Sequence, residues 1–363
     1  MWYYLLYPFR DLLNFLNILR YITFRASMAA LTAFVLVLVF GPAIIRTLKH
    51  LHIGQNVRER RVSEKLNDLH KSKQGTPTMG GIFILIAIIL STLFWAELTN
   101  KFILLALSGT VWLGITGFMD DYLKVVKKCS KGLTASAKFT SQIVLGLIIG
   151  IILYLDPSNS TNLDLPFLKE VSIELGIFYI IFVIVVITGS SNAVNLTDGL
   201  DGLAIGTTVF ASIAFAVLCY VSGNIKISEY LLIPFINGSG ELTVFCASII
   251  GAGLGFLWFN CYPAAVFMGD VGALALGGAL GIVAVLIKKE LLLVLVGGVF
   301  VIEALSVILQ VASFRFTGKR LFKCSPLHHH FQFIGWSENQ IIVRFWIIAS
   351  LLALLTLVTL KIR

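Results

Sequence analysis

The sequence predicts an all-α, polytopic membrane protein with about ten transmembrane helices. Apolar residues make up 58% of the 363 residues and charged residues only 13%, and the mean hydropathy is +0.92. An ordinary soluble domain is roughly half apolar and a quarter charged. Runs of about 18 or more apolar residues, each long enough to cross a bilayer, recur along the chain. A lipid bilayer is therefore the expected environment of one integral membrane domain covering residues 1–363.

The predicted elements follow in chain order. Residues 1–26 are rich in aromatic residues and Leu but are interrupted by Arg10, Asp11 and Arg20, so they lack the apolar centre of a signal peptide. An interfacial N-terminal arm is predicted there instead. The spans are then expected at residues 27–45, 79–96, 102–119, 139–155, 175–194, 203–221, 242–258, 272–287, 291–314 and 341–360. The five cysteines are scattered and indicate packing roles rather than disulfides or a zinc site.

The distribution of Lys and Arg predicts the orientation in the membrane. With ten spans, 18 of the 28 basic residues lie in loops that follow odd-numbered spans or, for Arg344, in the first turn of the span after such a loop. The positive-inside rule makes those loops cytoplasmic and places both termini on the outer face. The net charge of +9 is then explained by topology, and no nucleic-acid partner is expected.

Two adjacent carboxylates, Asp120 and Asp121, end the third apolar run. An ionised Asp inside a bilayer costs roughly 2.5 to 3.5 kcal/mol, and a second one beside it adds repulsion unless a cation or water shares the site. Lys124 lies four residues after Asp120, on the same face of a helix. The pair is interpreted as part of a metal or phosphate-transfer site that faces water; a surface salt-bridge network is the alternative.

Two further cytoplasmic loops also carry carboxylates. Asp198 and Asp201 are three residues apart, which places both on one side of a helical turn. Asp270 stands at the start of the eighth span and suits either a magnesium ligand or a helix N-cap. Phe267 offers a face for a nucleobase, although a membrane-interface aromatic residue is the commoner explanation.

The remaining polar candidates are basic or imidazole groups. Lys73 precedes a Gly-Thr-Pro turn and the second span, which suits an anion seat or an ordinary basic loop. His328, His329 and His330 cannot all face one ion from a helix, so hydrogen bonding to phosphate or sugar is favoured over zinc, with a solvated turn as the alternative. Glu303 is alone in the ninth span, as a bundle-interior group or as part of a substrate path. The other candidates share one predicted face, which favours one composite site.

Five strings, in order, resemble the polyprenyl-phosphate sugar-1-phosphate transferases. They are Gly-Thr-Pro-Thr-Met-Gly-Gly at 75–81, Asp-Asp-Tyr-Leu-Lys at 120–124, Asn-Leu-Thr-Asp-Gly-Leu-Asp-Gly at 195–202, Phe-Met-Gly-Asp-Val-Gly at 267–272 and Pro-Leu-His-His-His at 326–330. The resemblance implies a bacterial inner-membrane enzyme, usually a homodimer, with Mg²⁺ as cofactor. It implies transfer of phospho-MurNAc-pentapeptide from UDP-MurNAc-pentapeptide to undecaprenyl phosphate, with release of UMP, in peptidoglycan synthesis.

The same resemblance implies roles for individual residues. It implies catalytic roles for Asp120, Asp121, Lys124 and Asp270, with Asp121 and Asp270 on the metal. The positions that it implies for substrate binding are Lys73, Asn195, Asp198, Asp201, Asn260, Phe267, His328, His329 and His330. Direct attack by the acceptor phosphate is favoured, with Asp120 accepting or steering its proton and Asp121 on the metal or the acceptor phosphate. A covalent phospho-Asp route stays open, as does the question of which of the two aspartates handles the proton.

Two rival functions remain. A transferase for N-acetylhexosamine 1-phosphate belongs to the same superfamily, but the His string and the following Gly335-Trp336 favour the muramoyl-pentapeptide branch. A secondary transporter could have as many spans, but its site usually lies near the midplane between internal repeats. No repeat is evident here, and the Asp residues lie at span ends.

Overall fold

The computed structural model describes residues 7–11, 13–51, 75–127, 132–165 and 172–361. Nine helices in these ranges are long and apolar enough to cross a membrane. They are α2 (Ile22–His50), α5 (Lys101–Val125), α6 (Ala135–Leu155), α7 (Phe178–Thr197), α8 (Leu203–Ser222), α10 (Leu242–Asn260) with η4 (Ser239–Glu241) before it, α11 (Gly269–Leu286), α13 (Gly298–Thr317) and α15 (Glu338–Thr359). A shorter apolar helix, α4 (Gly81–Trp95), accompanies them. The predicted all-α, polytopic fold is confirmed.

Short elements connect these helices. They are η1 (Tyr7–Asp11), η2 (Asn14–Arg20), α9 (Ile225–Leu231), α12 (Glu290–Val296), α14 (Leu327–Ile334) and an antiparallel pair of strands, β1 (Asn162–Asp164) and β2 (Ser172–Glu174). The sequence analysis did not predict the strands. It also extended the N-terminal arm to residue 26, whereas α2 begins at Ile22.

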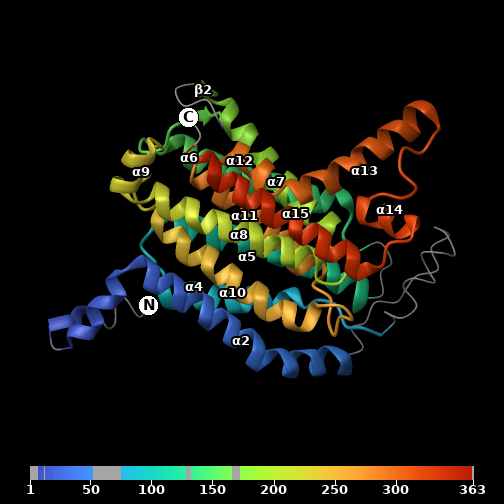
Figure 1. The fold of residues 1–363 in the computed structure, drawn as a ribbon, viewed down its shortest axis with the longest axis horizontal. Coiled ribbons are helices and arrows are strands. Elements are labelled where there is room, and N and C mark those ends of the chain that lie inside the picture. The colour runs from blue at the N-terminus through green and yellow to red at the C-terminus, as the bar shows by residue number, and fades with distance from the viewer. Residues whose placement is uncertain (1–6, 12, 52–74, 128–131, 166–171, 362–363) are drawn as a thin grey trace.

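The single ninth span predicted at 291–314 is wrong, because two helices occupy that stretch. Gly297 separates α12 from α13 with φ −88° and ψ 19°, and its backbone interrupts the helix. Glycine has a low helix propensity, and an apolar run does not reveal such a break. Beyond it, α13 leans away from the other helices, with α14 below its far end (Figure 1).

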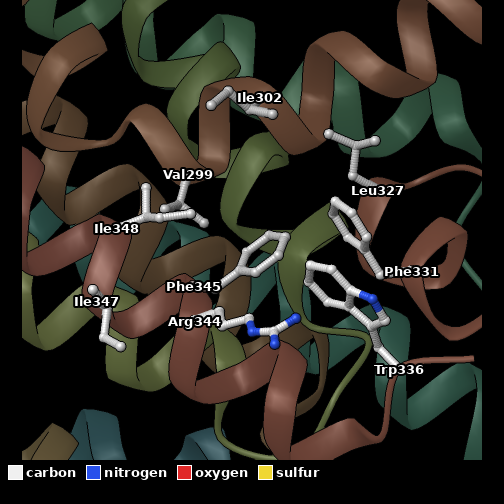
Figure 2. A pocket seen from close by; sticks show the side chains of 9 residues that line it. All are labelled: Val299, Ile302, Leu327, Phe331, Trp336, Arg344, Phe345, Ile347 and Ile348. Atoms are coloured by element: carbon white, nitrogen blue, oxygen red, sulfur yellow. The ribbon is translucent and has the colours of Figure 1, made fainter.

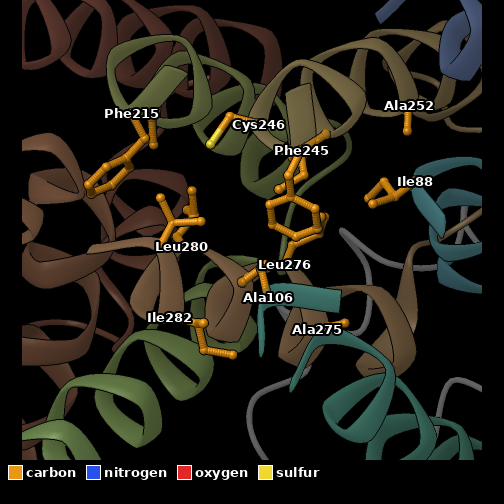
Figure 3. Close-up of a cluster of buried hydrophobic side chains, with 14 of the residues drawn as sticks. Ile88, Ala106, Phe215, Phe245, Cys246, Ala252, Ala275, Leu276, Leu280 and Ile282 are labelled. Atoms are coloured by element: carbon orange, nitrogen blue, oxygen red, sulfur yellow. The ribbon is translucent and has the colours of Figure 1, made fainter. Parts of the chain in front are cut away.

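The centre of the bundle is α11, of which 89% is buried. Its small and aliphatic residues, among them Leu276 and Leu280, pack among side chains from α5, α8 and α10 (Figure 3). Close helix packing of this kind depends on small residues, because lipid provides no hydrophobic force that drives one helix onto another. A Cβ added to Gly278 would lie 1.9 Å from Cδ1 of Leu113, so the Leu113 side chain of α5 occupies the space that a side chain at position 278 would need.

One end of the bundle collects the segments that carry the predicted site. In Figure 1 the far end of α10, the start of α15 and the helix α14 all lie at the right-hand end, opposite the C-terminus. The ends of α5 and α7 and the start of α11 meet there, since Asp270 in the first turn of α11 contacts Lys124 and Asn195. The fold therefore brings residues from most of the chain length to one face.

Candidate active site

Three carboxylates form the centre of the site. Asp120 and Asp121 lie near the end of α5, and Asp270 lies in the first turn of α11. Each offers one carboxylate oxygen, and these oxygens lie within 4.8 Å of one another. The side chain of Asp120 is fully buried, whereas Asp270 retains 17% exposure. The cluster therefore opens to its surroundings on the Asp270 side.

Two glycines allow α5 and the start of α11 to approach this closely. A Cβ on Gly117 would lie 2.3 Å from the carbonyl oxygen of Asp270. Gly269 has φ +74°, a left-handed conformation that favours glycine, and a Cβ there would lie 2.6 Å from Oδ2 of Asp121. Side chains at either position would push the carboxylates apart.

Two lysines neutralise much of this negative charge. Lys138, in the first turns of α6, places its Nζ 2.8 Å from Oδ2 of Asp120 and 2.5 Å from Oδ2 of Asp270. Lys124 contacts the same two carboxylates, with its Nζ 2.8 Å from Oδ2 of Asp270. Three carboxylates and two ammonium groups leave the cluster one charge short of neutrality.

The cluster suits a hard divalent cation. Carboxylate oxygens are the ligands that Mg²⁺ prefers. Oδ2 of Asp120 is buried and has no aligned hydrogen-bond donor, although both ammonium groups lie against it. The other two carboxylates are oriented by donors, since Val271 N–H donates to Asp121 (3.2 Å) and Asn195 Nδ2 donates to Asp270 (2.9 Å). The donor set therefore fits the expected ion.

A fourth carboxylate borders the cluster. Asp198 directly follows α7 and accepts a hydrogen bond from the backbone N–H of Gly269. Its burial, together with the negative charges of Asp270, Asp121 and Asp201, raises the pKa of Asp198 to about 7. A carboxyl group with such a pKa holds a proton for part of the time at neutral pH and can then donate a hydrogen bond.

Asp201 and Asn260 connect two loops. Oδ2 of Asp201 accepts a hydrogen bond from Ala264 N–H at 3.0 Å. The side chain of Asn260 accepts from Gly202 N–H at 2.9 Å and donates to the carbonyl of Val266 at 2.8 Å. Both side chains are buried. These hydrogen bonds hold the turn at 198–202 against the loop at 261–268. Direct contact of Asp201 and Asn260 with the substrate stays a prediction.

Phe267 belongs to the same system of loops. Its N–H donates to Pro77 O and its carbonyl accepts from Gly80 N–H, both at 2.8 Å. These bonds fix the loop at 261–268 against the start of α4. The Phe267 side chain is half-buried, and the residue lies three positions before Asp270 in the sequence.

The three histidines have three different partners, as expected for consecutive positions on a helix. His328 is buried against Glu303. Its ring Nδ1 lies 3.2 Å from Oε2 of Glu303, and its backbone N–H donates to Oε1 at 3.1 Å. His329 Nδ1 pairs with Gln332, and His330 Nδ1 accepts from Lys323 N–H. The structure thus explains Glu303 as the carboxylate that holds the start of α14.

Among these imidazoles, His328 faces the turn at 198–202. A Cβ on Gly199 would lie 2.2 Å from its Nε2. That nitrogen is buried and has no hydrogen-bond partner among the described residues. Glu303 therefore orients His328 toward the loop that carries Asp198.

Comparisons with known proteins identify the family of this chain. The model of glycosyl transferase family 4 matches residues 102–288, and signature 1 of the phospho-N-acetylmuramoyl-pentapeptide-transferases matches residues 73–85. Full-length proteins of that name are 53% identical in Methylacidiphilum infernorum, 52% in Desulfotalea psychrophila and 53% in Citrifermentans bemidjiense, with 100% of both chains covered in each case. The chain belongs to the phospho-N-acetylmuramoyl-pentapeptide-transferase family.

The family matches cover different parts of the predicted site. The family 4 model includes all four central positions, Asp120, Asp121, Lys124 and Asp270. The transferase signature begins at Lys73, which lies outside the described residues. The histidines fall beyond both matches but within the full-length similarity.

Sequence reasoning missed two residues that the structure brings to this transferase site. Lys138 was one of several lysines in a basic loop, and only the fold brings it 18 positions back to Asp120. Glu338 was not singled out, yet its Oε1 accepts from Asp201 N–H at 3.0 Å. The one available signal for Lys138 was its position near the start of an apolar helix. A cation is unfavourable at that end of the helix dipole, so a lysine there suggests a nearby anion.

Proposed function

We propose that this protein transfers phospho-MurNAc-pentapeptide from UDP-MurNAc-pentapeptide to undecaprenyl phosphate and releases UMP, in peptidoglycan synthesis. The observation that carries the proposal is the set of three carboxylates within 4.8 Å, in a chain of this family. The residues that would hold Mg²⁺ are Asp121 and Asp270, with Asp120 beside them. When bound, the ion would neutralise negative charge on the diphosphate and orient it.

The reaction is a direct displacement. An oxygen of undecaprenyl phosphate forms a bond to the phosphorus attached to the sugar, the bond from that phosphorus to the bridging oxygen breaks, and UMP leaves with that oxygen. The acceptor phosphate needs little help to lose its proton. A phosphate monoester has a second pKa near 6, so roughly nine-tenths of it is already the dianion at pH 7.

Because most of the acceptor phosphate is already deprotonated, a general base is not the main requirement, and this bears on the role proposed for Asp120. Its oxygen lies against both ammonium groups, and Leu133 N–H donates to its other oxygen at 2.7 Å. A fully buried carboxylate in this setting is better suited to position Lys124 and Lys138 against the reacting phosphates than to carry a proton. We therefore propose positioning as its main task, and proton steering as the minor one.

The nucleoside side of the substrate is proposed to lie along the loops next to Asp270. Asn195, Asp198, Phe267 and His328 are proposed to border that space. Substrate binding by Lys73, which lies outside the described residues, is proposed from its place in the transferase signature. Asp201 and Asn260 support the nucleoside side by fixing the loops, and His329 and His330 line the side of α14. The functional unit proposed is a homodimer of single-domain chains in the bacterial inner membrane, with this face in the cytoplasm and both termini in the periplasm.

UMP release in detergent tests the function. The purified protein should form UMP from UDP-MurNAc-pentapeptide only when both undecaprenyl phosphate and Mg²⁺ are present, and a chelator should stop the reaction. Competition by excess UDP-N-acetylglucosamine should have no effect. UMP formed without the acceptor would contradict direct displacement, and inhibition by the hexosamine nucleotide would favour the rival transferase.

The pH profile of Asp120→Asn tests the role of that residue. Loss of one preorganised charge contact lowers the rate on the order of 100-fold or more. If Asp120 positions the lysines, that factor stays constant as the pH rises above 7. A loss that shrinks with rising pH, where the acceptor is already deprotonated, would assign proton removal to Asp120. Asp156→Asn is the matched control, because Asp156 pairs with Lys101 at the other end of α5.

A further inference from the structure

A groove lies between α13, α14 and α15. It encloses a cavity of about 400 Å³ (Figure 2). Its walls are aliphatic and aromatic side chains, which include Val299, Ile302, Leu327, Phe331, Ile347 and Ile348. In a membrane protein, a groove of this kind takes an apolar chain of lipid size.

One charged residue, Arg344, lines this groove. Its guanidinium lies 4.0 Å from the ring of Trp336, and that ring stacks on Phe331 with a centroid distance of 4.5 Å. Within the described part of the chain, no carboxylate or carbonyl oxygen accepts a hydrogen bond from Arg344. Stacking leaves the N–H groups of a guanidinium available, and their planar arrangement matches a phosphate.

The position of Arg344 along α15 fits a lipid head group. It lies six residues after the first residue of α15, roughly 9 Å along the axis, so its side chain can extend to the membrane interface. Exposed Arg315, Lys319, Arg320 and Lys323 follow on the neighbouring segment and make the same interface positive. Each basic residue near a membrane surface attracts anionic lipid by about 1 kcal/mol, which is roughly a fivefold effect on binding.

We propose that this groove binds an anionic glycerophospholipid of the leaflet on the active-site side. Its phosphate contacts Arg344, and one acyl chain lies between α13 and α15. The acceptor lipid is the less suitable occupant, because the acidic cluster lies on α5 and α11 whereas α15 packs against α8, α12, α13 and α14. A phosphate at Arg344 is thus held on a different set of helices from the reacting carboxylates.

The bound lipid would brace two helices that support the site. On α14, His328 reaches the turn at 198–202, while Leu327 and Phe331 line the groove. On α15, Trp346 Nε1 donates to Gly202 O at 3.2 Å, and Glu338 accepts from Asp201 N–H. Occupancy of the groove therefore steadies the nucleoside side of the site. This consequence for turnover depends on the proposed function, whereas lipid binding does not.

Retention of lipid tests the proposal. The full-length protein is taken from bilayers of phosphatidylcholine and phosphatidylglycerol, and the lipids that it keeps are measured by native mass spectrometry. Arg344→Gln should keep phosphatidylglycerol roughly fivefold less well than the wild type. Ile348→Trp, which fills the groove, should lose it, and Arg344→Lys should retain part of it. Arg46→Gln is the control, since Arg46 is an exposed arginine on α2.

Three results would overturn the proposal. Equal retention of phosphatidylglycerol by wild type and Arg344→Gln would show that the arginine does not hold the head group. Displacement of the retained lipid by one equivalent of undecaprenyl phosphate would make the groove an acceptor site. Loss of the dimer in Ile348→Trp, with lipid retention unchanged, would make it a subunit interface. A rise in turnover with phosphatidylglycerol, absent in Arg344→Gln, would support the bracing of the site.

Discussion

At the scale of single residues, the site brings together four carboxylates whose negative charges repel one another. Two unit charges 4 Å apart interact by about 4 kcal/mol at an effective dielectric constant of 20, so four neighbouring carboxylates need compensation. Lys124 and Lys138 supply it for Asp120 and Asp270. The pKa of Asp198 is raised by burial and by neighbouring carboxylates, and the group that opposes this rise is one backbone N–H rather than a lysine. The proton of Asp198 is the remaining compensation.

Asp198→Asn should therefore stabilise the metal-free protein at high pH. The pKa of Asp198 is raised from 3.8 to about 7, so the folded state favours its protonated form, and stability falls as the pH rises from about 4 through 7. An amide removes this penalty. The thermal midpoint of the variant should exceed that of the wild type by several degrees near pH 8 and match it near pH 4. An advantage that is the same at both pH values would contradict the assignment.

The carboxylates could be predicted from the sequence because ionisable residues are rare in apolar runs. Asp120, Asp121 and Asp270 stand out for that reason. Lys138 could not be selected, since its partner is distant in the sequence and several lysines surround it. The structural role of Asp201 and Asn260 could not be predicted either, because a hydrogen bond between two loops produces no spacing pattern in the sequence.

At the scale of helices, the site depends on how closely α5 meets α11. The carbonyl of Asp270 lies where a Cβ of residue 117 would be, so backbone contact determines the separation of the carboxylates. Apolar run lengths predicted nearly all these helices. The break at Gly297 was not predicted, because the apolar run continues through it. The position of α14 was not predictable, because it depends on tertiary contacts such as the one between Glu303 and His328.

Gly117→Ala tests this dependence on close packing. The added methyl group would lie 2.3 Å from a backbone oxygen, so α5 and α11 must separate, at a cost of about 1 to 3 kcal/mol. Turnover should fall at least tenfold in protein that still elutes as the wild type does. Gly189→Ala on α7 is the matched control, since its methyl group meets nothing within 4 Å. Equal activity of both variants would refute the packing argument.

At the scale of the whole molecule, the apolar surface of the helices places the protein in a membrane, and the site lies at one end of the bundle. The charge distribution among loops predicted which end faces the cytoplasm, because Lys and Arg resist transfer across the bilayer. That orientation stays a prediction, and the loop charges gave no indication of which residues on this face contact one another. Assembly of the site required α11 at the centre, with α5 and α7 packed along it.

Labelling of Cys261 tests the orientation. This cysteine is exposed in the loop between α10 and α11, whereas Cys219 and Cys246 are buried. In a variant with Cys129 and Cys324 changed to Ser, a membrane-impermeant maleimide should label Cys261 in inverted vesicles and not in intact spheroplasts. Labelling from outside would place the site in the periplasm. Cys261→Ser in the same background reports any residual reaction.

The most direct test of the account is binding of Mn²⁺, as a substitute for Mg²⁺, measured by electron paramagnetic resonance. The wild type and the control Asp156→Asn should each bind one ion per chain at the carboxylate cluster. Asp270→Asn and Asp121→Asn should bind it at least about tenfold more weakly, because even a partner of a metal ligand contributes that much. Wild-type affinity in Asp270→Asn would contradict the claim that these carboxylates hold the metal for phosphoryl transfer.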